Sequence, residues 1–273
     1  MDRDDAAFID SRSLLHTAGS MRQTLQTLLS SVDSMAEHLD PENEDCLRHA
    51  SAALRSIYQL IRISDNLSAF SMLQDGSYPL CLRRQSVFGA VSAVAEQAAG
   101  LLQLKQITLE LKLPERDYIG QLDDRLLSLM LWNLLANAAA HTDDGRLSLQ
   151  AERRGQAEIL ICLTNWQKDA APLELEALFD RYSRAPEDQR NADGLGVGLR
   201  LVQQAAALHG GGLLISTTPE GKVTAVLRLQ TEKLSAENIQ SPVLLPEQQL
   251  NDGLIALSPI LPDSAFDPRD VLW

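Results

Sequence analysis

The stretch "DGLGVGLRLVQQAAALHGG", residues 193–211, decides the fold predicted for this chain of 273 residues. Gly194, Gly196 and Gly198 alternate with other residues, and an apolar helical segment begins near Val197. Glycines allow close backbone approach, and the first turn of a helix presents free N–H groups and a positive dipole end. The stretch therefore predicts an anion site, and we expect a phosphate chain as its ligand. The spacing matches neither the dinucleotide glycine pattern nor the P-loop.

A second motif lies upstream, in "LMLWNLLANAAAHT", residues 129–142. Asn133 and Asn137 stand four residues apart on one helix face, with His141 one turn further. Two amides on a helix that is otherwise leucine and alanine are costly to bury without partners. Amide oxygens suit a hard cation such as Mg²⁺, which itself binds phosphate oxygens. The motif predicts a magnesium–phosphate site, and hydrogen bonds from the helix to a loop are the alternative.

The first part of the chain has two apolar seams with spacings of three and four, the pattern of a helix bundle. Asp40–Pro41 separates them, because a residue before proline disfavours the helical conformation. An antiparallel hairpin is predicted. Each seam is too narrow to bury itself, so a four-helix dimer is expected, and packing on the chain's own second domain is the alternative. The seams are Leu14, Ala18, Met21, Leu25, Leu28, Val32, Met35 and Leu39, then Leu47, Ala50, Leu54, Ile57 and Ile61.

The remaining chain mixes helical and strand-like segments, which indicates an α+β protein: the hairpin is followed by an α/β sandwich with helices on one face of a sheet. A turn-rich break at residues 74–79 predicts the boundary. The expected parts are residues 1–75, 77–230 and a tail, 231–273. The tail holds the apolar patches "PVLLP" and "GLIALSPIL", which we expect to dock on the body.

Composition restricts the function. The net charge of −13 argues against a nucleic-acid binder and disfavours anionic membrane surfaces. No apolar run reaches the roughly 18 residues of a membrane span, and the acidic start is unlike a signal peptide. The 3 cysteines are widely separated, so reduced thiols are expected. A cytoplasmic protein without a membrane span is predicted.

These motifs, together with "LFDRYSR" at residues 178–184, resemble the asparagine, phenylalanine and second glycine boxes of sensor histidine kinases, in the same order. The boxes belong to an ATP-binding domain shared with gyrase, heat-shock chaperone and mismatch-repair ATPases. The similarity covers residues 77–230. The preceding hairpin resembles the dimerisation and histidine-phosphotransfer domain of the same kinases.

The resemblance implies ATP and Mg²⁺ as cofactors. Asn137 would coordinate the metal, and Asn133 would contact metal or phosphate. Phe179 would anchor a lid over the nucleotide, and Arg181 and Arg184 could reach the phosphates. A simple core role for Phe179 and a solvated surface for the two arginines are the alternatives. The further residues assigned to the nucleotide pocket are His141, Gly194, Gly196, Gly198 and Leu199.

The first glycine box of the family departs from its usual form here. Asn165 stands at the position of the aspartate that accepts from the adenine amino group, and Gln167 and Asp169 replace glycines. Ala140 stands where many members carry a lysine. A neutral acceptor is weaker than a charged one, so weaker nucleotide affinity is expected.

The phosphoacceptor motif is also altered. In "GSMRQTLQTL", residues 19–28, Arg22 takes the arginine place, which puts Gly19 where the histidine should be. His16, three residues upstream, faces outward and is the candidate nucleophile. Thr17 replaces the acid that would accept its proton. An ordinary surface histidine is the alternative.

Three functional hypotheses follow, of which two are favoured. One is a homodimeric histidine kinase that autophosphorylates on His16 and passes the phosphoryl group to a response regulator. The other is a degenerate pseudokinase, a dimeric regulatory module that binds nucleotide weakly or not at all and contacts another signalling protein. A serine kinase of the anti-sigma-factor type is a third, disfavoured by the hairpin.

Overall fold

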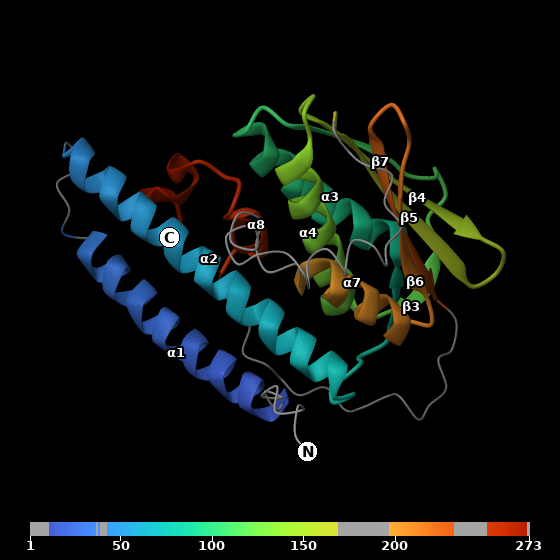
Figure 1. The fold of residues 1–273 in the computed structure, drawn as a ribbon, viewed down its shortest axis with the longest axis horizontal. Coiled ribbons are helices and arrows are strands. Elements are labelled where there is room, and N and C mark those ends of the chain that lie inside the picture. Colours follow the sequence, from blue (N-terminus) through green and yellow to red (C-terminus); the bar gives the residue numbers. More distant parts are fainter. Residues whose placement is uncertain (1–10, 37, 39–42, 169–196, 232–249, 272–273) are drawn as a thin grey trace, which may run out of the picture.

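The computed structural model describes residues 11–36, 38, 43–168, 197–231 and 250–271. A long helical hairpin lies beside a body made of a sheet and helices, and the C-terminal segment packs between them (Figure 1). This arrangement confirms the predicted fold class.

The hairpin consists of α1 (Ser11–Ala36) and α2 (Glu44–Gln74). Asn43 caps α2 by accepting a hydrogen bond from the Cys46 N–H at 3.1 Å. Two acidic residues in the first turn of α2 stabilise the helix, because their negative charges lie at the positive end of its dipole. The helix ends before Gly76, whose φ of 72° is in the left-handed region. The break therefore falls where the sequence predicts it.

Apolar packing and one buried hydroxyl join the two helices. Ala18 and Leu25 of α1 are buried, as are most of the predicted seam residues of α2. The Ser64 hydroxyl donates to the carbonyl oxygen of Ala18 at 2.7 Å. Leu28 and Met35, by contrast, are 48% and 65% exposed. The outer part of the α1 seam is thus uncovered in the single chain, and the dimer that would cover it stays a prediction.

The body contains a five-stranded sheet with the order β2-β4-β5-β7-β6 and a two-stranded sheet of β1 and β3. The β2–β4 pair is parallel, and the other pairs are antiparallel. The strands are β1 (Arg83–Ser86), β2 (Thr108–Lys112), β3 (Ile119–Leu122), β4 (Arg146–Arg154), β5 (Glu158–Trp166), β6 (Gly212–Thr217) and β7 (Lys222–Gln230).

Three helices, α3 (Val87–Gln103), α4 (Asp124–His141) and α7 (Val197–Leu208), cover one face of the large sheet (Figure 1). Alternate residues of β5 are buried beneath them, as the period of a strand requires. Most of α4 is buried, which explains why its sequence is apolar almost all round. Among the helices that the structure describes, none has the length and apolarity of a membrane span.

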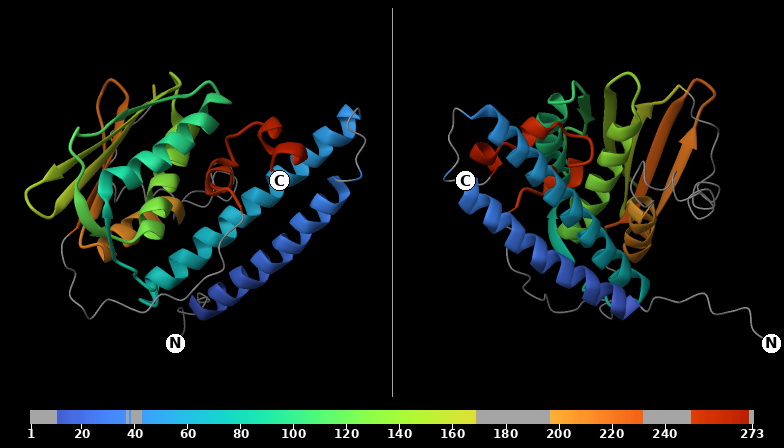
Figure 2. Two further views of the ribbon diagram at one scale, coloured as in Figure 1. Left: turned by 180° about the vertical axis from the view of Figure 1, so that it is seen from behind. Right: turned by 60° about the vertical axis from the view of Figure 1, so that its left-hand side comes forward.

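The C-terminal segment forms α8 (Asp252–Leu257), η2 (Asp263–Phe266) and α9 (Pro268–Val271). Figure 2 shows it between α2 and the helices of the body. The apolar patch "GLIALSPIL", residues 253–261, is therefore docked as predicted. The other patch, "PVLLP", is residues 242–246, which lie outside the described residues. Helix α2, which carries the second apolar seam, also packs on α7 and α8. Packing of the hairpin on the chain's own second domain is the alternative that the sequence leaves open beside a dimer.

Candidate nucleotide site

Asp123 starts the helix that carries the two asparagines. Its carboxylate accepts from the Leu126 N–H at 2.9 Å, which caps α4, and from the Cys81 N–H at 2.7 Å. Asp123 is buried, so both charge-assisted bonds are shielded from water. The start of α4 is thereby fixed to the chain that leads into the body.

Asn133 is buried in the middle of α4, and both its amide nitrogen and its amide oxygen form hydrogen bonds. Its Nδ2 donates to the Leu129 carbonyl at 2.9 Å. It also forms a reciprocal pair with Asn66 of α2, with Nδ2 donating at 3.3 Å and Oδ1 accepting at 3.2 Å. These bonds offset the cost of burying the amide. The sequence did not predict Asn66 as a site residue.

Gly198, in the first turn of α7, lies directly against Asn133. A Cβ atom built on Gly198 would stand 2.7 Å from the Asn133 Oδ1 atom, so only glycine fits there without a shift. Leu199 is 7% exposed and anchors α7 in the core. The asparagine box and the end of the second glycine box, which are 65 residues apart in sequence, therefore meet at one point.

Asn137 and His141 follow on α4, one and two turns after Asn133. Both side chains are half-buried, and within the described part of the chain no hydrogen bond is made by either side chain. Their parts in a metal or nucleotide site stay predictions.

Asn165 lies near the end of β5 on the helix-covered face and is 5% exposed. It stands opposite Leu147 of β4 and Val223 of β7 in the sheet register. A neutral acceptor is thus buried at the position that the resemblance assigns to the family's aspartate. Of the two residues that replace glycines, Gln167 continues the strand pairing by donating its N–H to the Gly221 carbonyl at 2.8 Å; Asp169 is outside the described residues.

Several predicted residues cannot be related to this site, because they lie outside the described residues. They are Phe179, Arg181, Arg184, Gly194 and Gly196.

His209 joins the far end of α7 to the start of α4. The imidazole is 0% exposed, and its Nε2 atom accepts from the Asp123 N–H at 3.4 Å. Burial lowers the pKa of His209, although the neighbouring Asp123 acts in the opposite direction. The neutral ring thus helps to hold α7 beside α4, which keeps Gly198 against Asn133.

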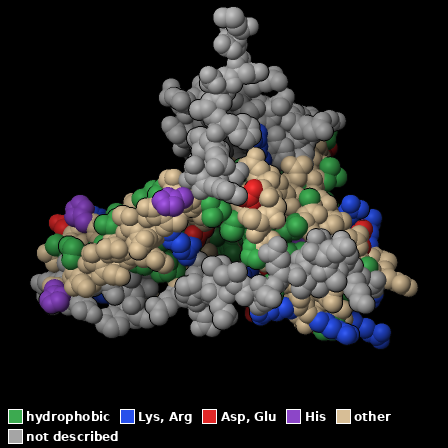
Figure 3. Space-filling view, turned by 90° about the horizontal axis from the view of Figure 1, so that it is seen from below, with side chains coloured by type: hydrophobic (Ala, Val, Ile, Leu, Met, Phe, Trp, Pro, Cys, Tyr) green, Lys and Arg blue, Asp and Glu red, His purple; other side chains and the backbone are tan. Residues whose placement is uncertain are grey.

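The candidate phosphoacceptor lies on the hairpin surface, where histidine side chains are visible in Figure 3. His16 is exposed on α1, and Gly19, one turn later, faces open space. Arg22 pairs with Asp65 of α2. The arginine place of the motif is therefore used to join the two helices of the hairpin.

Parts of this chain are similar to known proteins. Residues 122–233 match the model of the histidine kinase-, DNA gyrase B- and HSP90-like ATPase family. The histidine-protein kinase AfsQ2 of Streptomyces coelicolor is 27% identical over 70% of this chain and 34% of its own length. The sensor histidine kinase ZraS of Salmonella typhimurium is 36% identical over 37% of this chain and 21% of its own length. The chain thus spans only part of each relative.

A solved structure, full-length ShkA in complex with AMPPNP, has the same fold. It superposes with a TM-score of 0.63 at 19% identity, over 82% of this chain and 47% of that one.

Proposed function

We propose that this chain binds magnesium-ATP where α4 meets α7, as part of a histidine-kinase-like signalling protein. The match of residues 122–233 to the ATPase family that histidine kinases share with gyrase B and HSP90 supports this proposal. The observation that carries the proposal is the contact between Asn133 and Gly198. It joins an amide oxygen, a suitable ligand for Mg²⁺, to a helix start that suits phosphate.

The residues present fit this ligand. A side chain at position 198 would fill the space beside the Asn133 oxygen, which the glycine leaves open. Asn133 and Asn137 would hold Mg²⁺ through their amide oxygens, and the N–H groups at the start of α7 would face the phosphates. Bound Mg²⁺ supplies charge neutralisation of the triphosphate. His141 and Leu199 complete the proposed pocket among the described residues.

Asn165 would accept from the adenine amino group. Because its amide is neutral, we expect weaker binding than in members with an aspartate. Phe179, Arg181, Arg184, Gly194 and Gly196 keep the roles that the family resemblance gives them.

His16 is the proposed phosphoacceptor, because it is the exposed imidazole nearest to the expected histidine position. In the transfer, a ring nitrogen of His16 bonds to the γ-phosphorus of ATP. The bond from that phosphorus to the β–γ bridging oxygen breaks, ADP leaves, and the ring proton passes to water. We further propose a homodimer through residues 1–75 and a response regulator as acceptor.

Incubation with γ-labelled ATP and Mg²⁺ tests this proposal. We expect an acid-labile label on the protein that disappears in His16→Ala and persists in His49→Ala, an exposed histidine of the same hairpin. A label that survives in His16→Ala would contradict the assignment of the phosphoacceptor.

A second candidate is a regulatory module that binds nucleotide without phosphotransfer. It is favoured by Thr17 at the place of the proton acceptor and by Gly19 at the place of the histidine. Nucleotide binding with no label on any histidine would support it over the kinase.

A further inference from the structure

One face of α2 carries polar side chains toward the body. Arg55, Gln59 and Asn66 follow one another at spacings of four and seven residues, so they lie on one stripe of the helix. Asn66 contacts Asn133 of α4, whereas Arg55 and Gln59 contact the C-terminal segment. The same face of α2 therefore touches both the candidate nucleotide site and the end of the chain.

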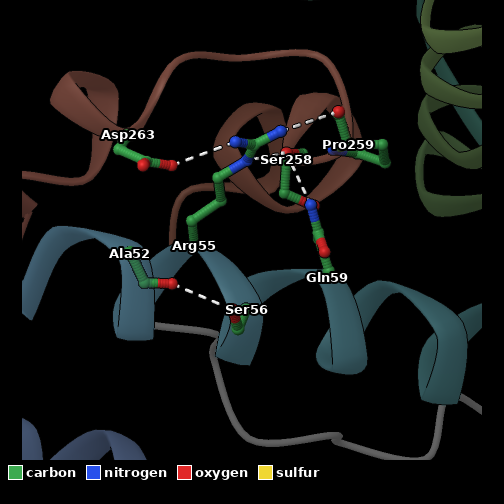
Figure 4. Close-up of polar contacts among 7 residues, drawn as sticks. All are labelled: Ala52, Arg55, Ser56, Gln59, Ser258, Pro259 and Asp263. Atoms are coloured by element: carbon green, nitrogen blue, oxygen red, sulfur yellow. Dashed lines mark hydrogen bonds and ion pairs between the residues drawn. The ribbon is translucent and has the colours of Figure 1, made fainter. Parts of the chain in front are cut away.

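Arg55 binds the C-terminal segment through three groups (Figure 4). Its guanidinium donates to the carbonyl oxygens of Ser258 at 3.1 Å and Pro259 at 3.0 Å, and to the Asp263 carboxylate at 3.0 Å. Gln59 donates to the same Ser258 carbonyl at 3.2 Å. These contacts satisfy the free carbonyls after α8 and tie them to α2.

Apolar contacts reinforce this attachment. The rings of Tyr58 and Phe266 lie 5.4 Å apart at an angle of 58°. Both residues are among the most completely buried in the chain. Aromatic pairs in this tilted geometry add to the free energy gained from burial.

The other side of the segment packs on the body. A Cβ atom built on Gly253 of α8 would stand 2.7 Å from the Leu101 side chain of α3 and 2.9 Å from the Trp132 ring of α4. Gln97 of α3 donates to the Asn251 side chain at 3.0 Å. Residues 250–271 thus contact the hairpin and the body at once.

We propose that residues 250–271 are an internal clamp that holds α2 against the body, keeps Asn66 paired with Asn133, and thereby opposes the binding of magnesium nucleotide. The inference rests on the proposed function. A ligand that takes the Asn133 oxygen competes with Asn66, and the Asn66 pair requires α2 in its clamped position. By reciprocity, releasing the clamp strengthens nucleotide binding by the same factor by which nucleotide weakens the clamp.

Two substitutions in the full chain release the clamp from opposite sides. Arg55→Ala removes the bonds to α2, and Gly253→Val forces α8 away from α3 and α4. Arg48→Ala is the control, because this exposed α2 arginine pairs only with Asp45 in the described contacts. Calorimetry measures the affinity for AMPPNP with Mg²⁺, and amide hydrogen exchange measures the protection of residues 250–261.

We expect both releasing variants to bind the nucleotide at least about fivefold more tightly than the wild type, with faster exchange in residues 250–261. Asn66→Ala should also bind more tightly, but with unchanged exchange in that segment, because it breaks the amide pair and leaves the clamp in place. The control should match the wild type in both measurements.

Faster exchange without tighter binding would overturn the clamp's opposition to nucleotide and leave the proposed function standing. Unchanged exchange in both releasing variants would overturn the clamp itself. If no variant bound nucleotide, the proposed function would fail, and this inference would fail with it.

Discussion

Asp123→Ala is the substitution whose cost is best defined by the structure. The carboxylate caps α4 through Leu126 and binds the Cys81 N–H, and the residue is only 3% exposed. Loss of a helix cap costs about 1 kcal/mol. Loss of a hydrogen bond to a buried charged group costs about 2 kcal/mol more. We therefore expect the free energy of unfolding to fall by about 3 kcal/mol.

Urea unfolding followed by circular dichroism measures this change, with Asp124→Ala as the matched control. Asp124 is exposed in the first turn of α4 and acts mainly on the helix dipole, so its replacement should cost about 0.5 kcal/mol. Asp123→Asn should fall between the two, because one oxygen can still cap the helix. Equal costs for Asp123→Ala and Asp124→Ala would refute the reasoning.

Three further predictions concern the elements around the site. Gly211→Ala should lower the free energy of unfolding by more than about 2 kcal/mol, because its Cβ would stand 1.7 Å from a β7 carbonyl oxygen. The matched control, Gly212→Ala, has open space around its Cβ and should cost under about 1 kcal/mol, and thermal unfolding measures both. Burial lowers the pKa of His209 in the folded protein below its unfolded value of about 6.5, so the stabilising contribution of the neutral ring is complete above pH 6.5. As the pH falls below 6.5, this contribution is lost by at most about 1.4 kcal/mol per pH unit, which urea unfolding at a series of pH values measures. Gly198→Ala should change the free energy of unfolding by less than about 1 kcal/mol, since the gain in helix propensity offsets the disturbed amide pair of Asn133. It should nevertheless weaken nucleotide binding in calorimetry, because the added Cβ would occupy the space beside the Asn133 oxygen.

Local patterns in the sequence were sufficient to predict the hairpin, α4 and the start of α7 near Val197. The signals for these elements are apolar periods, capping residues and glycines, and each of them involves residues only a few positions apart in the sequence. The period alone does not say which seam residues the single chain covers: Leu28 is exposed, whereas its neighbour Leu29 packs against the core. A helical period fixes a face only to within a residue.

Contacts between distant residues could not be read from local patterns. The β1–β3 pair joins the polar strand "RRQS" to Ile119–Leu122, and neither strand is long enough to show alternation. Asn66 pairs with a residue 67 positions away, and Arg55 with one 208 positions away. The polar stripe of Arg55, Gln59 and Asn66, on the side of α2 away from its apolar seam, is the signal that could have indicated both of these contacts.

A calorimetric titration with AMPPNP, with and without Mg²⁺, tests most directly whether α4 and α7 together form a nucleotide site. We expect the wild-type chain to bind in the presence of Mg²⁺ and Asn137→Ala to lose binding while keeping its fold. No binding by the wild type, or equal affinity in Asn137→Ala, would contradict the account.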